Sequence, residues 1–140
     1  MISPVKAKQE IRILYEATRD LIPGGWSEGT GEWGPCGTET GQDGVEYTVF
    51  SQRHNQPLPS EAKSIAEEAQ ALWSRHGYSV EIENDQTLAP PRYILSFPPY
   101  LTGSAPSGLW FRFTVGKNYA DFTATSRCVQ GDQETLNSNE

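Results

Sequence analysis

The two cysteines, Cys36 and Cys128, are the feature that most constrains the fold of this 140-residue chain. Cys36 follows a Gly/Pro-rich turn in GEWGPCGTE, and Cys128 ends a strand-like run, DFTATSRC, near the C-terminus. An even number of cysteines in a small protein without clustered metal ligands is typical of an oxidising compartment. We therefore expect a Cys36–Cys128 disulfide that joins the two ends of a sheet region. Two buried, unpaired thiols remain the alternative.

Apolar periodicity predicts two helices. Ser3 and Pro4 form a helix start, and apolar residues then recur at intervals of three and four until Pro23 ends the helix. A second helix is expected between Pro59 and Gly77, with one stripe of small and apolar side chains. This stripe contains Ala62, Ile65, Ala69, Leu72, Trp73 and His76.

Alternation of apolar and polar residues predicts the strands. It is clearest in VEYTVFSQR, residues 45–53, and in the hairpin GLWFRFTV, GKN, YADFTATSRC, residues 108–128. Shorter alternating runs begin at Tyr78 and Tyr93. The chain order predicts an α+β fold, with two helices packed on one face of an antiparallel sheet of about five to six strands. The free face would carry Glu46, Thr48, Gln52, Glu81, Glu83 and Arg112.

Length and composition indicate one domain and a tail. A chain of 140 residues fits a single domain with a core of its own. We expect residues 1–129 to form this domain. Residues 130–140, QGDQETLNSNE, are polar and contain no aromatic residue, which predicts a flexible C-terminal tail. The protein is expected to be a monomer.

The charge of the chain limits its partners. The formal net charge is −7, from 18 acidic and 11 basic side chains, so nucleic acid would be repelled. No apolar run approaches the ~20 residues needed to cross a bilayer. The N-terminal MISPVKAKQEI lacks the long apolar segment of a signal peptide. Either the protein is cytosolic, or an export segment has been removed.

The sequence offers little support for catalysis or metal binding. The two histidines, His54 and His76, are too few and too far apart for a metal site, and no cofactor is expected. Glu81 and Glu83 share one strand face and could form an acid/base pair, but solvated strand charges give the same pattern. GGWSEGTGEWGPCG lacks the Lys-Ser/Thr of a phosphate-binding loop. These observations favour a protein that is not an enzyme.

One local feature indicates a binding surface. Tyr100, Trp110 and Arg112 could form an exposed aromatic patch beside the loop YLTGSAPSG. Tryptophan, tyrosine and arginine are enriched at the energetic centres of protein interfaces. The alternative is that Trp110 is buried beneath this loop, because large aromatic side chains are mostly covered.

With these features placed, the chain resembles the small exported lipoproteins of actinobacteria. The resemblance rests on the tryptophan before Cys36, the second helix that ends at Trp73, and the terminal SRCVQGD, and it covers residues 4–132. In that family a lipidated signal segment precedes a compact domain with one disulfide, whose second cysteine lies in a similar Cys-Val-x-Gly-Asp ending. The resemblance implies that Cys36 and Cys128 are the matching pair, and that the membrane is reached only through a removed lipid anchor. It implies no catalytic residue.

The sequence supports one functional expectation and leaves two alternatives open. We expect an extracytoplasmic, non-enzymatic binding or accessory domain that recognises a protein or cell-envelope component. One alternative is an immunity or inhibitor protein, whose acidic face would mask a basic partner. The other is a hydrolase that uses carboxylates in a cleft beside the glycine-rich loop.

Overall fold

The computed structural model describes residues 2–29, 31–38, 41–85, 87, 91–99 and 105–138. Within these ranges the chain forms three helices and six strands. The helices are α1 (Pro4–Arg19), α2 (Ala62–Arg75) and α3 (Gln133–Ser138). The strands are β1 (Gly31–Gly37), β2 (Asp43–His54), β3 (Ile82–Asp85), β4 (Arg92–Phe97), β5 (Trp110–Gly116) and β6 (Tyr119–Thr125).

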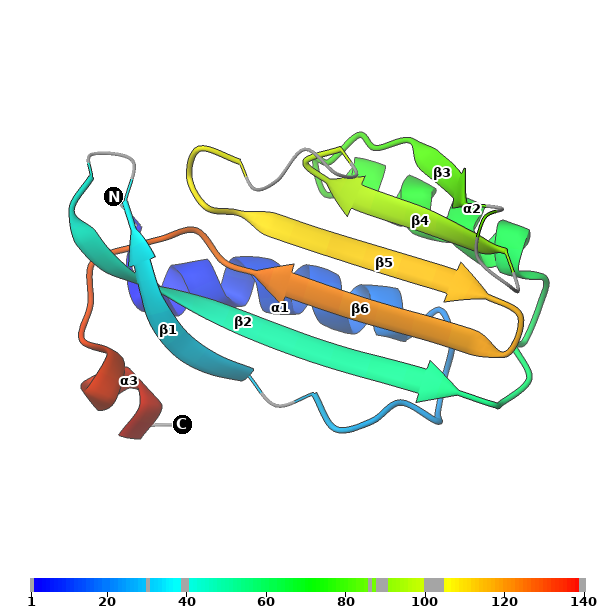
Figure 1. Cartoon of the computed structure of the whole chain (residues 1–140), viewed down its shortest axis with the longest axis horizontal. Helices are drawn as coiled ribbons and strands as arrows, with labels where there is room; N and C mark the ends of the chain where they lie inside the picture. The colour runs from blue at the N-terminus through cyan, green and yellow to red at the C-terminus, as the bar shows by residue number, and fades with distance from the viewer. Residues whose placement is uncertain are drawn as a thin grey trace.

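The six strands form one antiparallel sheet in the order β1-β2-β6-β5-β4-β3. Helices α1 and α2 lie side by side behind this sheet and leave its other face uncovered by helices (Figure 1). α1 contacts β2 and β6, and α2 contacts β3, β4 and β5. The predicted α+β class, with two helices on one face of an antiparallel sheet, is confirmed.

The helix ends follow from local sequence. The hydroxyl of Ser3 accepts a hydrogen bond from the Lys6 amide at 3.3 Å, and Pro4 occupies the first turn of α1. α2 ends before Gly77, whose φ of 91° is a conformation that favours glycine. His76, predicted to share the apolar stripe of α2, is instead exposed at the helix end.

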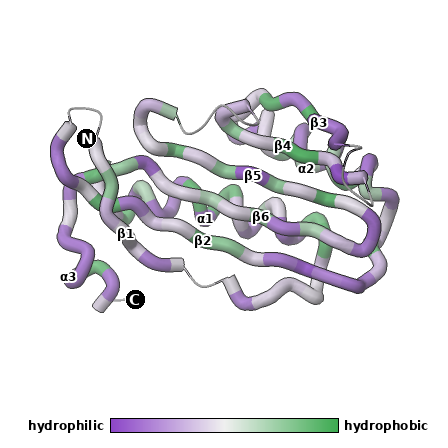
Figure 2. The backbone as a smooth tube through the Cα atoms, in the orientation of Figure 1, coloured by the Kyte–Doolittle hydropathy of each residue, from purple (hydrophilic) through white to green (hydrophobic). Residues whose placement is uncertain are grey.

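The core lies between the two helices and the sheet. The buried Trp73 of α2 makes edge-to-face contacts with Phe111 and Phe122, at centroid distances of 4.9 and 6.0 Å. Its indole N–H donates to the Thr18 hydroxyl of α1 at 3.0 Å, and that hydroxyl donates to the Leu14 carbonyl at 2.7 Å. A satisfied polar chain therefore joins α1 and α2 inside an otherwise apolar layer. Hydrophobic residues recur along α1 and the central strands, whereas α3 is mostly hydrophilic (Figure 2).

The β5–β6 hairpin has the predicted form. A two-residue turn at Lys117 and Asn118 joins the strands, and Asn118 has a φ of 57° that asparagine tolerates. The inward side chains of the returning segment are all buried, as the alternation predicts. They are Ala120, Phe122, Ala124 and Ser126. The alternation ends there, because Val129, and not Cys128, belongs to the core cluster.

The predicted disulfide is present. Cys36 in β1 is bonded to Cys128, with Cα atoms 6.0 Å apart and 92 positions between them in sequence. A Cβ atom at Gly44 would lie 2.9 Å from the Cys128 sulfur, so glycine is needed for this close approach. A disulfide is typical of an oxidising, extracytoplasmic environment. Of the helices in the described ranges, none combines the length and the apolar character that crossing a membrane requires.

The C-terminal segment contains a helix that its polar composition does not predict. α3 has six residues and no fully buried side chain, and it contacts the edge strand β1. Leu136 is partly buried against the core. The segment assigned to a flexible tail thus includes an element that lies against the sheet.

Candidate functional site on the open sheet face

The sheet face opposite the two helices, which we call the open face, carries the candidate site. Register places its outward side chains in rows that cross β2, β6, β5 and β4. In Figure 1 this face is turned toward the reader. Its rows are Thr48, Thr125 and Trp110; Phe50, Thr123, Arg112 and Ser96; Gln52, Asp121, Thr114 and Ile94; and His54, Tyr119, Gly116 and Arg92.

Three adjacent rows contribute to a polar group that we call the arginine–tyrosine cluster, made of Arg92, Arg112, Tyr119 and Asp121. The Tyr119 hydroxyl donates a hydrogen bond to Oδ2 of Asp121. The Arg92 guanidinium lies 4.0 Å from the centroid of the Tyr119 ring, a cation–π distance. The His54 ring contacts the same tyrosine at 5.3 Å between centroids. Tyr119 is therefore fixed by the Asp121 carboxylate at its hydroxyl and by the His54 ring and the Arg92 guanidinium beside its own ring.

Partial burial sets the electrostatics of this cluster. Burial, together with the hydrogen bond to Asp121, raises the pKa of Tyr119 to about 12, against the lowering effect of Arg92. Burial also raises the pKa of Asp121, opposed by the Tyr119 hydroxyl and by the positive charges of Arg112 and Arg92. The Asp121 carboxylate is thus mostly buried and hydrogen-bonded to Tyr119, whereas Arg92 and Arg112 carry the charge that the cluster presents to solvent.

The structure places two of the three predicted binding residues on the open face. Trp110 and Arg112 are both partly exposed, and the Arg112 guanidinium lies 5.2 Å from the Trp110 ring. Trp110 is therefore neither fully exposed nor buried. Phe50, in the row of Arg112, is an exposed aromatic residue on the same face, with 43% of its surface accessible. Tyr100 lies outside the described residues.

Sequence reasoning missed the other members of the cluster. Tyr119 and Asp121 alternate with the buried Ala120 and Phe122, so the strand pattern contains the signal that their side chains point outward. Arg92 begins β4, where the sequence indicates only a proline-rich loop entering a strand. Pairing of β4 with β5 and of β5 with β6 brings these residues together, and that pairing is not readable from one strand.

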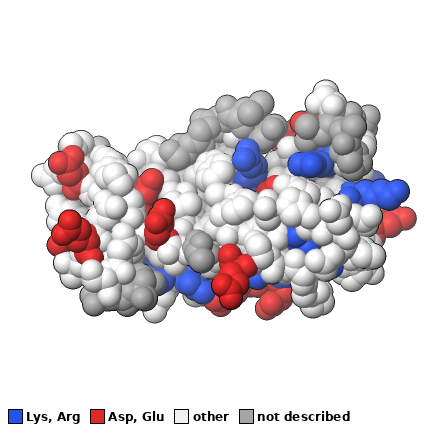
Figure 3. Space-filling view, turned by 60° about the horizontal axis from the view of Figure 1, so that its bottom comes forward, with Lys and Arg blue, Asp and Glu red and all other residues white. Residues whose placement is uncertain are grey.

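The β1 end of the sheet has the opposite charge. Glu32 lies on β1, while Asp43 and Glu46 on β2 face Gly37 and Gly34 of β1. Burial raises the pKa of Glu46. In Figure 3 the left end of the molecule shows acidic side chains without basic ones, whereas the centre and right show both. The molecule therefore offers a basic, aromatic surface and an acidic end.

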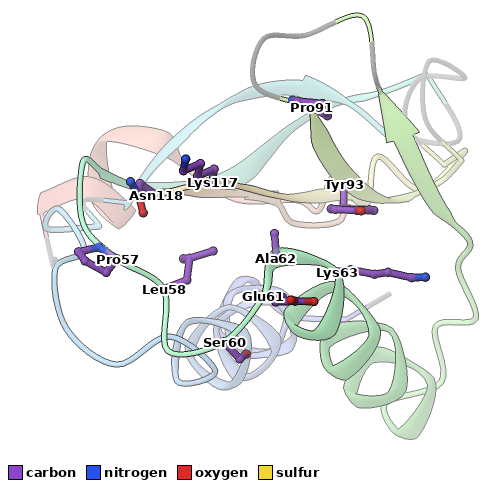
Figure 4. A pocket seen from close by; sticks show the side chains of 10 residues that line it. All are labelled: Pro57, Leu58, Ser60, Glu61, Ala62, Lys63, Pro91, Tyr93, Lys117 and Asn118. Carbon is purple, nitrogen blue, oxygen red and sulfur yellow. The ribbon is translucent and has the colours of Figure 1, made fainter.

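A groove of about 560 Å³ lies on the helix side of the sheet, and its lining includes Pro91 and Asn118, the chain neighbours of Arg92 and Tyr119 (Figure 4). Leu58, Ala62 and Tyr93 point into it, whereas the chain of Lys63 extends away from its centre. The full lining is Pro57, Leu58, Ser60, Glu61, Ala62, Lys63, Pro91, Tyr93, Lys117 and Asn118. The lining contains no histidine or cysteine, and its polar groups do not converge on one point, so the groove shows no catalytic arrangement.

Within the described ranges, no group of three or more histidine, cysteine or carboxylate side chains is placed to hold a metal ion. Glu81 and Glu83, considered as an acid/base pair, are both exposed. In comparisons with known proteins, no protein-family model matches the chain, and no match is found among curated proteins or solved structures.

Proposed function

We propose that this protein is an extracytoplasmic, non-enzymatic binding domain that acts as a monomer and recognises a protein or cell-envelope component through its open face. The observation that carries this proposal is the arginine–tyrosine cluster beside Trp110. Trp, Tyr and Arg are the residues most enriched at interface hot spots. Here they lie on a broad sheet face, a shape that suits another macromolecule better than a small molecule, which binds in a concave pocket.

The Cys36–Cys128 disulfide supports the proposed location, because such bonds persist in oxidising compartments. The resemblance to small exported lipoproteins of actinobacteria agrees with export and with attachment to the membrane through a lipid anchor. Both lines of support involve the same two cysteines, because the resemblance includes Cys36 and the SRCVQGD ending that contains Cys128.

The charge of the cluster indicates the chemistry of the ligand. Asp121 is mostly covered and accepts a hydrogen bond from Tyr119, so Arg92 and Arg112 dominate the local charge. Carboxylate and phosphate groups are the usual partners of guanidinium groups. A ligand with such anionic groups next to an apolar group that covers Trp110 would fit this surface.

The geometry does not favour the hydrolase alternative. Asp121 and Glu46 are the described carboxylates whose pKa values are raised. Asp121 faces Gln52 of β2, six positions along the strand from Glu46, which corresponds to roughly 20 Å. Carboxyl pairs that cleave glycosidic bonds lie about 5–10 Å apart. These two groups are too distant to act on one bond.

The inhibitor or immunity alternative is favoured by a separate observation, the acidic β1 end. Glu32, Asp43 and Glu46 would attract a basic partner and raise its rate of association. This role would use a different surface from the open-face proposal, so variants on one surface leave the other intact.

Co-sedimentation tests the open-face proposal. The oxidised protein is incubated with the insoluble wall fraction, which is then pelleted, and with envelope proteins of the producing organism fixed to beads. We expect the Trp110→Ala/Arg112→Ala variant to be retained at least about tenfold less than the unmodified protein, as hot-spot truncations are. The matched control is Arg75→Ala, an exposed arginine of α2 on the helix side of the sheet.

Two results would contradict this proposal. One is equal retention of the double variant and the unmodified protein, which would remove the open face as the binding surface. The other is no retention of the unmodified protein by either fraction, which would remove the binding role itself. Thermal unfolding of each variant confirms that lost retention reflects the surface and not the fold.

A further inference from the structure

The edge strand β1 directs the backbone groups of Trp33 away from the sheet. Trp33 pairs with Tyr47 of β2. The Tyr47 amide donates to the Ser126 hydroxyl at 2.8 Å, and its carbonyl accepts from the Ser126 amide at 2.8 Å, both on the side away from β1. In antiparallel sheets such a residue and its partner point their backbone groups in opposite directions. The N–H and C=O of Trp33 therefore point outward, where a seventh strand would pair.

The side chain of Asn137 in α3 occupies that position. The Trp33 amide donates to Oδ1 of Asn137 at 2.9 Å, and Nδ2 of Asn137 donates to the Trp33 carbonyl at 3.1 Å. One side-chain amide thus reproduces the acceptor and donor that one residue of a neighbouring strand supplies. The Asn137 amide therefore occupies the position on β1 where the backbone of an added strand would bond to Trp33.

This cap is held by few contacts. α3 has six residues, none of them fully buried, and Leu136 is its only partly buried side chain. Proteins protect exposed sheet edges in this way, because unpaired edges recruit other chains. On the same edge, Pro35 lacks an N–H, which removes one possible donor, but its carbonyl remains an acceptor. Displacing α3 would break the two Asn137 hydrogen bonds, uncover Leu136 and expose a strand able to pair.

The charge around the edge selects the partner. Side chains of even-numbered β1 residues point to the open face, so Glu32 projects there, and Glu46 lies one strand inward opposite Gly34. Every second side chain of an added strand would lie on this same face, beside Glu32. Basic side chains at alternate positions would complement it, whereas acidic ones would be repelled.

We propose that the β1 edge is a strand-acceptor site for an extended, basic segment of a partner protein, which pairs with β1 in place of Asn137. This is β-strand addition, in which backbone hydrogen bonds supply affinity and alternate side chains supply specificity. The site is separate from the arginine–tyrosine cluster, and it does not depend on the function proposed for the open face.

An NMR titration tests this site with a defined probe. The full-length, oxidised, ¹⁵N-labelled protein is titrated with an acetylated and amidated octapeptide of alternating lysine and valine. We expect saturable shifts in the amides of residues 31–37. The Asn137→Ala variant should bind about tenfold more tightly, since the peptide no longer competes with two hydrogen bonds. The matched control on α3, Gln133→Ala, should bind like the unmodified protein.

Two further probes separate strand pairing from charge attraction alone. A peptide of the same charge with alternate backbone amides N-methylated cannot form the ladder and should not bind measurably. The Glu32→Lys variant should bind the lysine peptide at least about fivefold more weakly. Because Glu32 is exposed, this variant tests the proposal even if Asn137→Ala disturbs the fold.

Three outcomes would overturn the proposal. The first is the absence of shifts in residues 31–37 with both the unmodified protein and Asn137→Ala. The second is equal binding of the N-methylated peptide, which would reduce the effect to charge. The third is dimerisation of Asn137→Ala in sedimentation experiments without peptide binding, which would make a second copy of this chain the occupant of the edge.

Discussion

Removing the disulfide should destabilise the protein by acting mainly on the unfolded chain. The bond between Cys36 and Cys128 closes a loop of 92 positions, for which chain entropy gives a stabilisation of about 4.6 kcal/mol. The folded state has its own restraints beside the bond. The Val45 amide donates to the Val129 carbonyl at 2.7 Å, and the reverse bond measures 3.0 Å. A Cys36→Ala/Cys128→Ala variant should therefore keep its fold and lose stability.

The expected change is large enough for thermal unfolding to measure. An unfolding entropy of about 2.1 cal/mol/K per residue gives roughly 0.3 kcal/mol/K for a domain of this length, so Tm should fall by about 16 °C. Calorimetry of the oxidised protein and the double variant measures this difference. As a control, a phosphine reductant should lower the Tm of the unmodified protein to that of the variant and leave the variant unchanged. A fall of less than about 5 °C would refute the argument from loop entropy. Two free thiols in the native protein, found by intact mass after alkylation, would remove the disulfide and the proposed location with it.

Two further predictions concern the polar groups of the fold. Thr18→Val should destabilise the protein by about 1–3 kcal/mol, because the buried indole N–H of Trp73 loses its acceptor. Urea unfolding measures this loss, and Thr18→Ser, which keeps the hydroxyl, should restore most of it. Equal stability of the Val and Ser variants would contradict this account. Burial, together with the hydrogen bond to Asp121, raises the pKa of Tyr119 from its ordinary value of 10.0 to about 12, so the folded chain keeps a proton that the unfolded chain releases. This contribution to stability is complete below about pH 10 and is lost as the pH rises through 12. The unmodified protein should accordingly lose more stability than Tyr119→Phe between pH 9 and 12, and parallel curves would show that the shift is absent.

Elements whose signals are local could be predicted from the sequence. Ser3 caps the first turn of α1 with its hydroxyl, and the Pro4 ring presets the backbone there, so both signals lie within a few residues of the helix start. Prediction of the β5–β6 hairpin required only the alternation of apolar and polar residues and a short turn between the two runs. The disulfide was predictable as well, since only one pairing of two cysteines exists within a chain.

Elements that depend on distant partners could not be predicted in the same way. The alternation of β2 puts Arg53 on the core side, where a charge is costly unless it is satisfied. In the structure its guanidinium donates to the carbonyls of Gly24, Gln56 and Pro57 at 2.9, 3.1 and 3.0 Å. No pattern in the sequence indicates that three loop carbonyls converge on this side chain.

The candidate site was predicted in part for the same reason. Trp110 and Arg112 stand two positions apart on one strand, so their shared face follows from a period of two. Arg92 and Tyr119 reach the same place only through the order of strands in the sheet. The contact between Asn137 and Trp33 spans 104 positions, and it lies in a segment whose composition indicates a tail.

The disulfide and the cap on β1 belong to one arrangement. Cys36 lies in the edge strand that α3 covers, and Asn137 follows Cys128 by nine residues. The covalent bond therefore keeps the cap within a few residues' reach of its edge, even when its two hydrogen bonds open. A tether this short gives an effective concentration in the millimolar range. A free strand at micromolar concentration must consequently offer more than the two backbone hydrogen bonds that it replaces. The acidic side chains beside the edge provide this additional binding free energy to a basic segment by charge attraction, whereas they repel an acidic one. The tethered cap therefore protects the edge and also makes it selective for basic segments.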